Sequence, residues 1–203
     1  MKKSVIIFAI FALLCVCGCD RNTGNVPQKA ELPDTGSFSE KNSWVTLSHY
    51  ATRNFLAGEI PENDLELIVL AGIRAPSARN LQPWFFTVVR EPDLARKIIP
   101  QTEDGNVLIV VSAEGDGKTN YVQILDCSLA VQNIYLTAQS LGYGSRIYTA
   151  PIENLNNNLK ADLEIPDSRS AVAVVRIGLF NIEADAISGA SGRRDADTMV
   201  TYK

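Results

Sequence analysis

The sequence is poor in the side chains that usually bind metals or form disulfides. It has one histidine and four cysteines in 203 residues, and only Cys127 lies beyond the first 19 positions. A zinc or iron centre needs several nitrogen or sulfur ligands, which His49 and Cys127 alone do not supply. A lone cysteine also excludes an internal disulfide in this part of the chain. With a net charge of −4 and a pI near 5.1, the chain lacks the basic excess typical of nucleic-acid-binding proteins.

Several catalytic signatures are absent as well. No GxGxxG motif follows a predicted strand, so a dinucleotide-binding fold has no direct support. The sequence shows no paired-carboxylate motif, no nucleophile motif and no internal repeat. These absences leave no candidate for general acid–base or nucleophilic catalysis.

The N-terminal segment predicts a lipoprotein signal. Two lysines precede the apolar run 5–16, which is shorter than the about 20 residues that a membrane-spanning helix needs. The segment ends in Val16–Cys19 (VCGC), where a small residue, Gly18, precedes Cys19 as in a bacterial lipobox. We expect cleavage before Cys19 and lipidation of that cysteine. The alternative is an ordinary signal peptide that happens to contain cysteines.

A lipid anchor implies attachment to the bacterial cell envelope. One acyl chain holds a protein to a membrane weakly, so stable anchoring needs more than one. Asp20 after the lipidated cysteine suggests retention at the inner membrane in some bacteria, but this rule does not hold everywhere. The choice between inner and outer membrane therefore stays open.

Composition divides the chain into three parts. Residues 1–19 form the predicted signal peptide, and the polar residues 20–42 are expected to form a flexible tether. Residues 43–203 are expected to form the folded domain with a C-terminal arm. Roughly 185 residues remain after processing, which is enough for one domain with a hydrophobic core.

Hydrophobic periodicity predicts a mixture of helices and strands in the folded domain. The predicted helices run from Trp44 to about 53–58, and over 61–74, 92–99, 121–141 and 152–163. The predicted strands cover 84–89, 106–112, 145–148 and 171–180. Because helices and strands do not alternate strictly, we predict an α+β fold.

Two segments suggest contact with a second subunit. Residues 121–141 are apolar nearly all round, which predicts a helix buried on several sides, as often happens in a subunit interface. Residues after 181 are polar and small, ending in Met199, Val200 and Tyr202. This tail is either disordered or an arm that packs on a partner subunit.

The most unusual local stretch is Ala75–Trp84 (APSARNLQPW), between a predicted helix and a predicted strand. Its prolines and polar residues predict a rigid loop. The side chains of Ser77, Asn80 and Gln82 offer donors and acceptors suited to the edge of a flat heterocycle. On local chemistry alone, a simple capped turn is the alternative.

A helix ending in Ala-Pro-Ser, followed by Asn-x-Gln-Pro-Trp and an apolar strand, resembles the signature loop of the nitroreductase family. The resemblance implies a mainly antiparallel sheet flanked by helices, an FMN cofactor and a homodimer. It also implies that the loop Pro76–Gln82 lies along the flavin, with Asn80 bonding the isoalloxazine ring.

Three further stretches resemble the family in the same order along the chain. They are the segment 49–53 before Phe55, the helix and turn of 126–148, and the basic pair Arg193-Arg194. The cofactor-binding residues implied by the resemblance are His49, Tyr50, Ala51, Arg53, Pro76, Ser77, Ala78, Asn80, Gln82, Tyr148, Thr149, Ala150, Arg193 and Arg194.

The chain also departs from the family pattern. His49 and Ala51 stand where the family has an arginine and a serine that help to hold the FMN phosphate. Losing a hydrogen bond to a charged group typically costs about 1.5–3 kcal/mol. His49 substitutes best when protonated. Arg53 keeps its family place, where a guanidinium near the flavin N1–O2 edge would favour the reduced ring.

The resemblance implies an FMN-dependent oxidoreductase. Electrons would pass from a reduced donor, NAD(P)H or another, to a nitroaromatic, quinone or similar small-molecule acceptor. NAD(P)H conflicts with export, because it is a cytoplasmic donor. The alternative is a non-catalytic flavin- or ligand-binding envelope lipoprotein, which the changes at His49 and Ala51 favour.

Overall fold

The computed structural model describes residues 45–47, 50–117, 120–183 and 194–203. Five strands form one sheet in the order β1-β5-β3-β2, with β4 also paired to β5. Every pairing is antiparallel. The strands are β1 (Phe55–Leu56), β2 (Phe85–Val89), β3 (Val107–Glu114), β4 (Gly144–Tyr148) and β5 (Arg169–Phe180).

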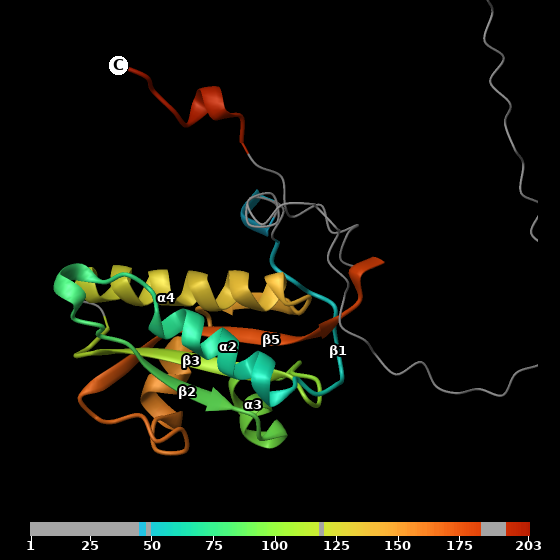
Figure 1. The fold of residues 1–203 in the computed structure, drawn as a ribbon. Helices are drawn as coiled ribbons and strands as arrows, with labels where there is room; N and C mark the ends of the chain where they lie inside the picture. Colours follow the sequence, from blue (N-terminus) through green and yellow to red (C-terminus); the bar gives the residue numbers. More distant parts are fainter. Residues whose placement is uncertain (1–44, 48–49, 118–119, 184–193) are drawn as a thin grey trace, which may run out of the picture.

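Helices cover both faces of this sheet (Figure 1). On one face, α2 (Glu62–Ile73) and the long α4 (Tyr121–Ser140) pack over the sheet, and their apolar residues share one core with it. On the other face lie α3 (Pro92–Ile98), α5 (Ile152–Asn154) and the π-helical η2 (Leu155–Leu159), around a second core. Because both faces are covered, the central strands β3 and β5 are nearly continuous apolar runs.

Helix boundaries follow local capping chemistry. The Glu91 side chain accepts hydrogen bonds from the Asp93 and Leu94 amides at the start of α3. Asn120 accepts from the Gln123 amide at the start of α4. After α4, the turn contains Gly142 at φ +84°, a conformation that favours glycine. None of the helices in the described ranges is both long and apolar enough to cross a bilayer.

The predicted helix from Trp44 to 53–58 is wrong from Tyr50 onward. Among the described residues only 45–47 are helical there, and the chain from Tyr50 to Asn54, before β1, has no regular secondary structure. The Thr52 amide donates to the Ser145 carbonyl at 3.1 Å, and Phe55 pairs with Phe180. Pairing with the sheet therefore overrides the helical spacing of the apolar residues.

Two other helix predictions need correction. The segment 152–163 is helical only in part, because α5 is three residues long and continues as a π-helical turn. The helix α4 is buried on one face of the single chain rather than on several. Tyr121, Leu125 and Leu129 are 68, 52 and 45% exposed on the other side.

The packing of α2 on the sheet and α4 gives a stability test. Ile68 is fully buried, whereas its neighbour Leu67 is 51% exposed. Ile68→Ala is expected to lower the free energy of unfolding by about 2–5 kcal/mol, because it removes buried surface and leaves a cavity. The matched change Leu67→Ala is expected to cost less than about 0.5 kcal/mol. Urea denaturation followed by circular dichroism measures both, and equal losses would contradict this packing.

Candidate functional site

The loop after α2 holds an unusual backbone. Its 3-10 turn η1 (Ala78–Asn80) contains Arg79 and Asn80 at φ +54° and +57°, and Gln82 follows at φ +47°. Left-handed conformations are uncommon for residues with a Cβ, and clusters of them are typical of active sites and ligand-binding sites. Of the four such non-glycine residues in the described ranges, three lie in this loop.

Hydrogen bonds hold the loop in this shape. The backbone N–H of Asn80 donates to the Ser77 carbonyl at 3.0 Å, and the backbone N–H of Gln82 donates to the Ser77 Oγ at 3.0 Å. Below the loop, the Ala78 amide donates to Asp126 Oδ1 at 3.0 Å. The side chains of Asn80 and Gln82 are exposed. The loop therefore has a fixed backbone and presents polar side chains outward.

The far end of the loop is held by Arg169 of β5. Its Nη1 donates to the Pro83 carbonyl at 2.8 Å, and its guanidinium lies 5.6 Å from the centre of the Phe85 ring. Trp84 is buried and stacks on Phe86, with ring centres 6.4 Å apart. The predicted residues Pro76, Ser77, Ala78, Asn80 and Gln82 thus lie together in one held loop, and their contact with a cofactor stays a prediction.

The predicted site residues Tyr50, Ala51 and Arg53, which precede β1, lie away from the loop. The Tyr50 carbonyl accepts a hydrogen bond from Gln139 Nε2 at 2.8 Å, close to the C-terminal end of α4. Thr52 is buried against β4, whereas Ala51 and Arg53 are exposed. Figure 1 shows η1 and β1 at opposite ends of α4.

The length of α4 separates the two groups within one chain. Asp126, which contacts the loop, and Gln139, which contacts the N-terminal segment, are 13 residues apart (139 − 126) in this helix. At a rise of ~1.5 Å per residue, this spacing is about 20 Å. Sequence reasoning expected Arg53 and Asn80 to reach the same ring, and within a single chain this expectation is wrong.

The predicted segment Tyr148–Ala150 begins with the last residue of β4. Thr149 and Ala150 are exposed. The Tyr148 side chain packs against the core on the α3 side of the sheet, with the Arg146 guanidinium 5.0 Å from its ring centre. This side chain therefore faces away from α4, and only the backbone and the two following residues remain available on the other side.

A buried arginine, Arg176, lies beside Tyr148 on the same face of the sheet. It is 3% exposed, and its Nε donates to Asn106 Oδ1 at 2.9 Å. Its guanidinium lies 4.1 Å from the centre of the Phe55 ring. Burial lowers the pKa of Arg176, and a hydrogen bond with Tyr148 partly opposes this shift. These contacts join β1, β4 and β5 to Asn106, the residue before β3, and have a structural role.

The remaining predicted residues cannot be assembled into the site. His49 and Arg193 lie outside the described residues. Arg194 is exposed within the C-terminal segment. Their predicted contact with a phosphate stays a prediction.

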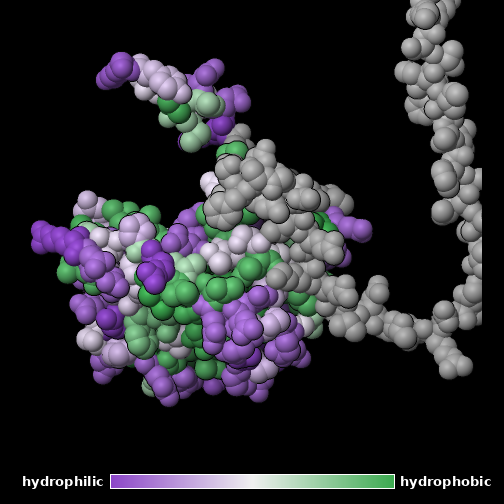
Figure 2. Space-filling view, in the orientation of Figure 1, coloured by the Kyte–Doolittle hydropathy of each residue, from purple (hydrophilic) through white to green (hydrophobic). Residues whose placement is uncertain are grey.

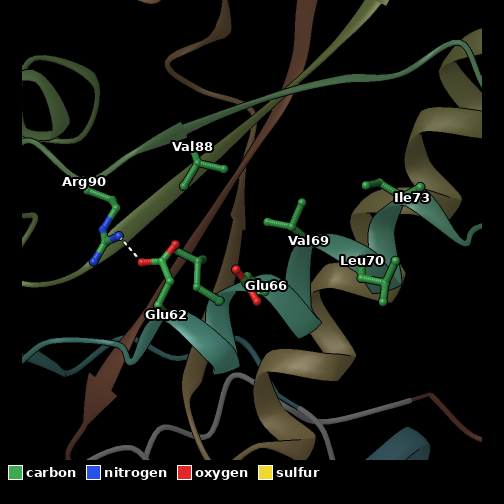
Figure 3. Close-up of a pocket in the computed structure, with 8 residues that line it drawn as sticks. Glu62, Glu66, Val69, Leu70, Ile73, Val88 and Arg90 are labelled. Carbon is green, nitrogen blue, oxygen red and sulfur yellow. Dashed lines mark hydrogen bonds and ion pairs between the residues drawn. The ribbon is translucent and has the colours of Figure 1, made fainter.

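Two cavities flank the edge strand β2. A groove of about 540 Å³ between α2 and β2 is lined mainly by apolar side chains, and Figure 2 shows apolar residues gathered on this face. The Glu62–Arg90 ion pair lies at one end and Leu70 and Ile73 toward the other (Figure 3). A second cavity of about 340 Å³ lies on the α3 side of β2. None of the predicted cofactor-binding residues lines either cavity.

Sequence reasoning did not single out Asp126, Gln139 or Arg169. Asp126 was the most visible of the three, because it is the only acid in an otherwise apolar helical run. Arg169 and Gln139 gave no comparable signal. Their importance depends on contacts between residues 86 and 89 positions apart.

Together these features define an α+β domain with an antiparallel sheet and a rigid polar loop at the start of its long helix. The sequence profile of the nitroreductase family matches residues 47–106 and 100–179, and the chain belongs to this family. A protein from Archaeoglobus fulgidus, provisionally named NADH dehydrogenase/NAD(P)H nitroreductase, is 36% identical over 136 residues. The match covers 63% of this chain and 78% of that protein.

Solved structures confirm the predicted fold. A nitroreductase with bound FMN from Bacteroides fragilis superposes with a TM-score of 0.64 at 20% identity, covering 81% of this chain and 99% of that one. A nitroreductase with bound FMN from Desulfitobacterium hafniense gives a TM-score of 0.65 at 22% identity, covering 80 and 98%. At these identities the likeness establishes the fold alone.

Cys127, next to Asp126, gives a chemical test of burial beneath the loop. Burial, and to a lesser degree the charge of Asp126, raises the pKa of the Cys127 thiol from 9.0 to about 11. At pH 8 this shift lowers the reactive thiolate fraction about a hundredfold. Iodoacetamide is therefore expected to modify Cys127 at least about a hundredfold more slowly in the native chain than in urea. Mass spectrometry of the Cys127 peptide measures the rate, and fast native modification would contradict the burial.

Proposed function

We propose that this chain is an FMN-dependent oxidoreductase of the nitroreductase type. It would pass electrons from a reduced donor to a nitroaromatic, quinone or similar acceptor, and it would act as a homodimer anchored to the envelope through Cys19. The observation that carries the proposal is the loop Ser77–Gln82, whose backbone is fixed by hydrogen bonds and whose polar side chains are exposed. Family membership and the FMN bound in two structures of the same fold support it.

The loop fits a flat heterocycle with polar edges. Asn80 and Gln82 present amide donors and acceptors, and the small side chains of Pro76 and Ala78 beside them are exposed. A fixed backbone keeps these groups in place before a ligand arrives, which lowers the entropic cost of binding. Bound FMN would supply the hydride and electron transfer, while the protein binds and orients it. Arg53 would provide the positive charge that favours the reduced ring.

A homodimer would bring together Arg53 and Asn80, which lie far apart in one chain. The exposed apolar residues of α4 recur at helical spacing on one face, Tyr121, Leu125 and Leu129. Exposed apolar surface of this kind marks an interaction site. A two-fold axis perpendicular to α4 would set the two α4 helices antiparallel, with the start of one helix directed toward the end of its partner. Each flavin site would then combine a loop from one subunit with an Arg53 from the other.

The anchor constrains the choice of electron donor. Lipidation of Cys19 would place the domain outside the cytoplasmic membrane, where NAD(P)H is scarce. We therefore propose a membrane quinol or a redox partner protein as the donor. The names of the curated relatives, which mention NADH and NAD(P)H, describe those proteins.

The cofactor and donor can be tested on the full chain purified in mild detergent. We expect a yellow protein, or one that takes up added FMN. Under anaerobic conditions the proposed class of donor predicts that a naphthoquinol bleaches the flavin faster than NADH does. Visible absorbance follows both reactions.

Two other outcomes would contradict parts of the proposal. A colourless chain that does not take up FMN would end it. A yellow chain that no donor reduces would favour the non-catalytic flavin-binding lipoprotein instead.

The composite site predicts subunit complementation. Arg53→Ala and Asn80→Ala are each expected to weaken FMN binding about tenfold or more, because each removes a polar contact to the ring. In a mixed dimer of the two variants, one site carries both defects and the other carries neither. Titration with FMN should therefore recover one tight site per mixed dimer.

Arg90→Ala serves as the control, because Arg90 is an exposed arginine of similar size that lines the groove beside β2. It should leave FMN affinity unchanged. A mixed dimer with no tight site would mean that Arg53 and Asn80 of the same subunit bind one FMN. That result would contradict a site shared between two subunits.

A further inference from the structure

Asp126 is a buried carboxylate with a single hydrogen bond among the described residues. It lies in the second turn of α4 and is 5% exposed. Its Oδ1 accepts from the Ala78 amide at 3.0 Å. Its Oδ2 is shielded from solvent and has no hydrogen-bond partner in the described part of the chain.

The surroundings of Asp126 include the positive charge of Arg169, which acts on the adjacent Cys127 thiol, but no hydrogen-bond donor to Oδ2 in the described part of the chain. Its buried neighbours along the same face of α4 are apolar, Cys127 and Ala130 among them. Burying a charged oxygen without a partner is unfavourable, and an apolar side chain of similar size usually suits such a position better. The helix dipole does not account for it, because its effect is confined to the first turn and Asp126 is the sixth residue of α4.

The one hydrogen bond of Asp126 leads to the loop. Ala78 is the first residue of η1, directly before Arg79 and Asn80 with their left-handed backbone. Because Asp126 belongs to a long helix packed on the sheet, its Oδ1 gives the loop a fixed reference point in the core. A buried group that is unfavourable for stability and makes one specific contact, as Asp126 does with the Ala78 backbone, is typical of a functional position.

We propose that Asp126 is a positioning residue, whose Oδ1 holds the Ala78–Gln82 loop in the conformation that binds the flavin. This inference rests on the proposed FMN-dependent function. Asp126 does not touch the ring, and it acts through the orientation of Asn80 and Gln82.

Four variants of the full chain separate this role from a general effect on stability. Asp126→Ala removes the acceptor, and Asp126→Leu removes it while keeping the volume filled, in case the alanine variant fails to fold. Asp126→Asn keeps an oxygen in the place of Oδ1. Asn120→Ala is the matched control, because it removes the cap of the same helix without touching the loop.

Two measurements are made on each variant. The first is the FMN dissociation constant, from quenching of flavin fluorescence. The second is the rate of tryptic cleavage after Arg79 in the apoprotein, identified by mass spectrometry. Cleavage after Arg176, which is buried in β5, reports global unfolding, so the ratio of the two rates isolates release of the loop.

The alanine and leucine variants are expected to raise the FMN dissociation constant and the cleavage ratio about tenfold or more. Asp126→Asn and Asn120→Ala are expected to stay within about threefold of the unmodified chain. Wild-type values for both the alanine and leucine variants would overturn the proposal. So would an asparagine variant that behaves like the alanine variant.

The two readouts keep this inference separate from the proposed function. If the unmodified chain binds no FMN, the proposed function fails, and the cleavage ratio still decides whether Asp126 holds the loop. If the unmodified chain binds FMN and the cleavage ratio does not change in the alanine and leucine variants, only the positioning role fails.

Discussion

The length and tight packing of α4 determine how far the candidate loop lies from the N-terminal segment Tyr50–Arg53. This helix approaches α2 so closely that a Cβ added at Gly72 would come within 2.8 Å of the Ile134 side chain. Side chains of α4 itself, Asp126 and Gln139, contact the loop near one end and the N-terminal segment near the other. Because a helix is stiff along its axis, the spacing of these two groups is a property of the fold and not of side-chain rotamers.

The loop at the start of α4 shows how an unfavourable local structure is kept. Three non-glycine residues with left-handed backbone cost of the order of 1–3 kcal/mol each. Contacts with Ser77, Asp126 and Arg169 oppose that cost from the two sides of the loop. These partners belong to the loop itself, to α4 and to β5. The rigidity of the loop therefore depends on how firmly α4 packs on the sheet.

Most of the fold could be predicted from the sequence, because the hydrophobic periodicity and the turn residues indicate the same element boundaries over most of the domain. The strands β2, β3 and β5 and the helices α2, α3 and α4 fall close to their predicted ranges. The segment from Tyr50 onward was mispredicted because its apolar residues have helical spacing, while Thr52 and Phe55 form long-range hydrogen bonds to the sheet. For the same reason the candidate loop was predictable, but the separation of Arg53 from Asn80 was not. That separation depends on which end of α4 each segment contacts.

The departures at His49 and Ala51 give the loop more weight in the proposed function. If the phosphate is held less strongly there than in the family pattern, more of the binding free energy must come from contacts to the ring. Such contacts contribute fully only when their geometry is set before binding, because any ordering of the loop would be subtracted from the affinity. A weaker phosphate site and a firmly held ring site are therefore compatible in one protein. The strain stored between Arg79 and Gln82 is then the local cost of orienting that ring site in advance.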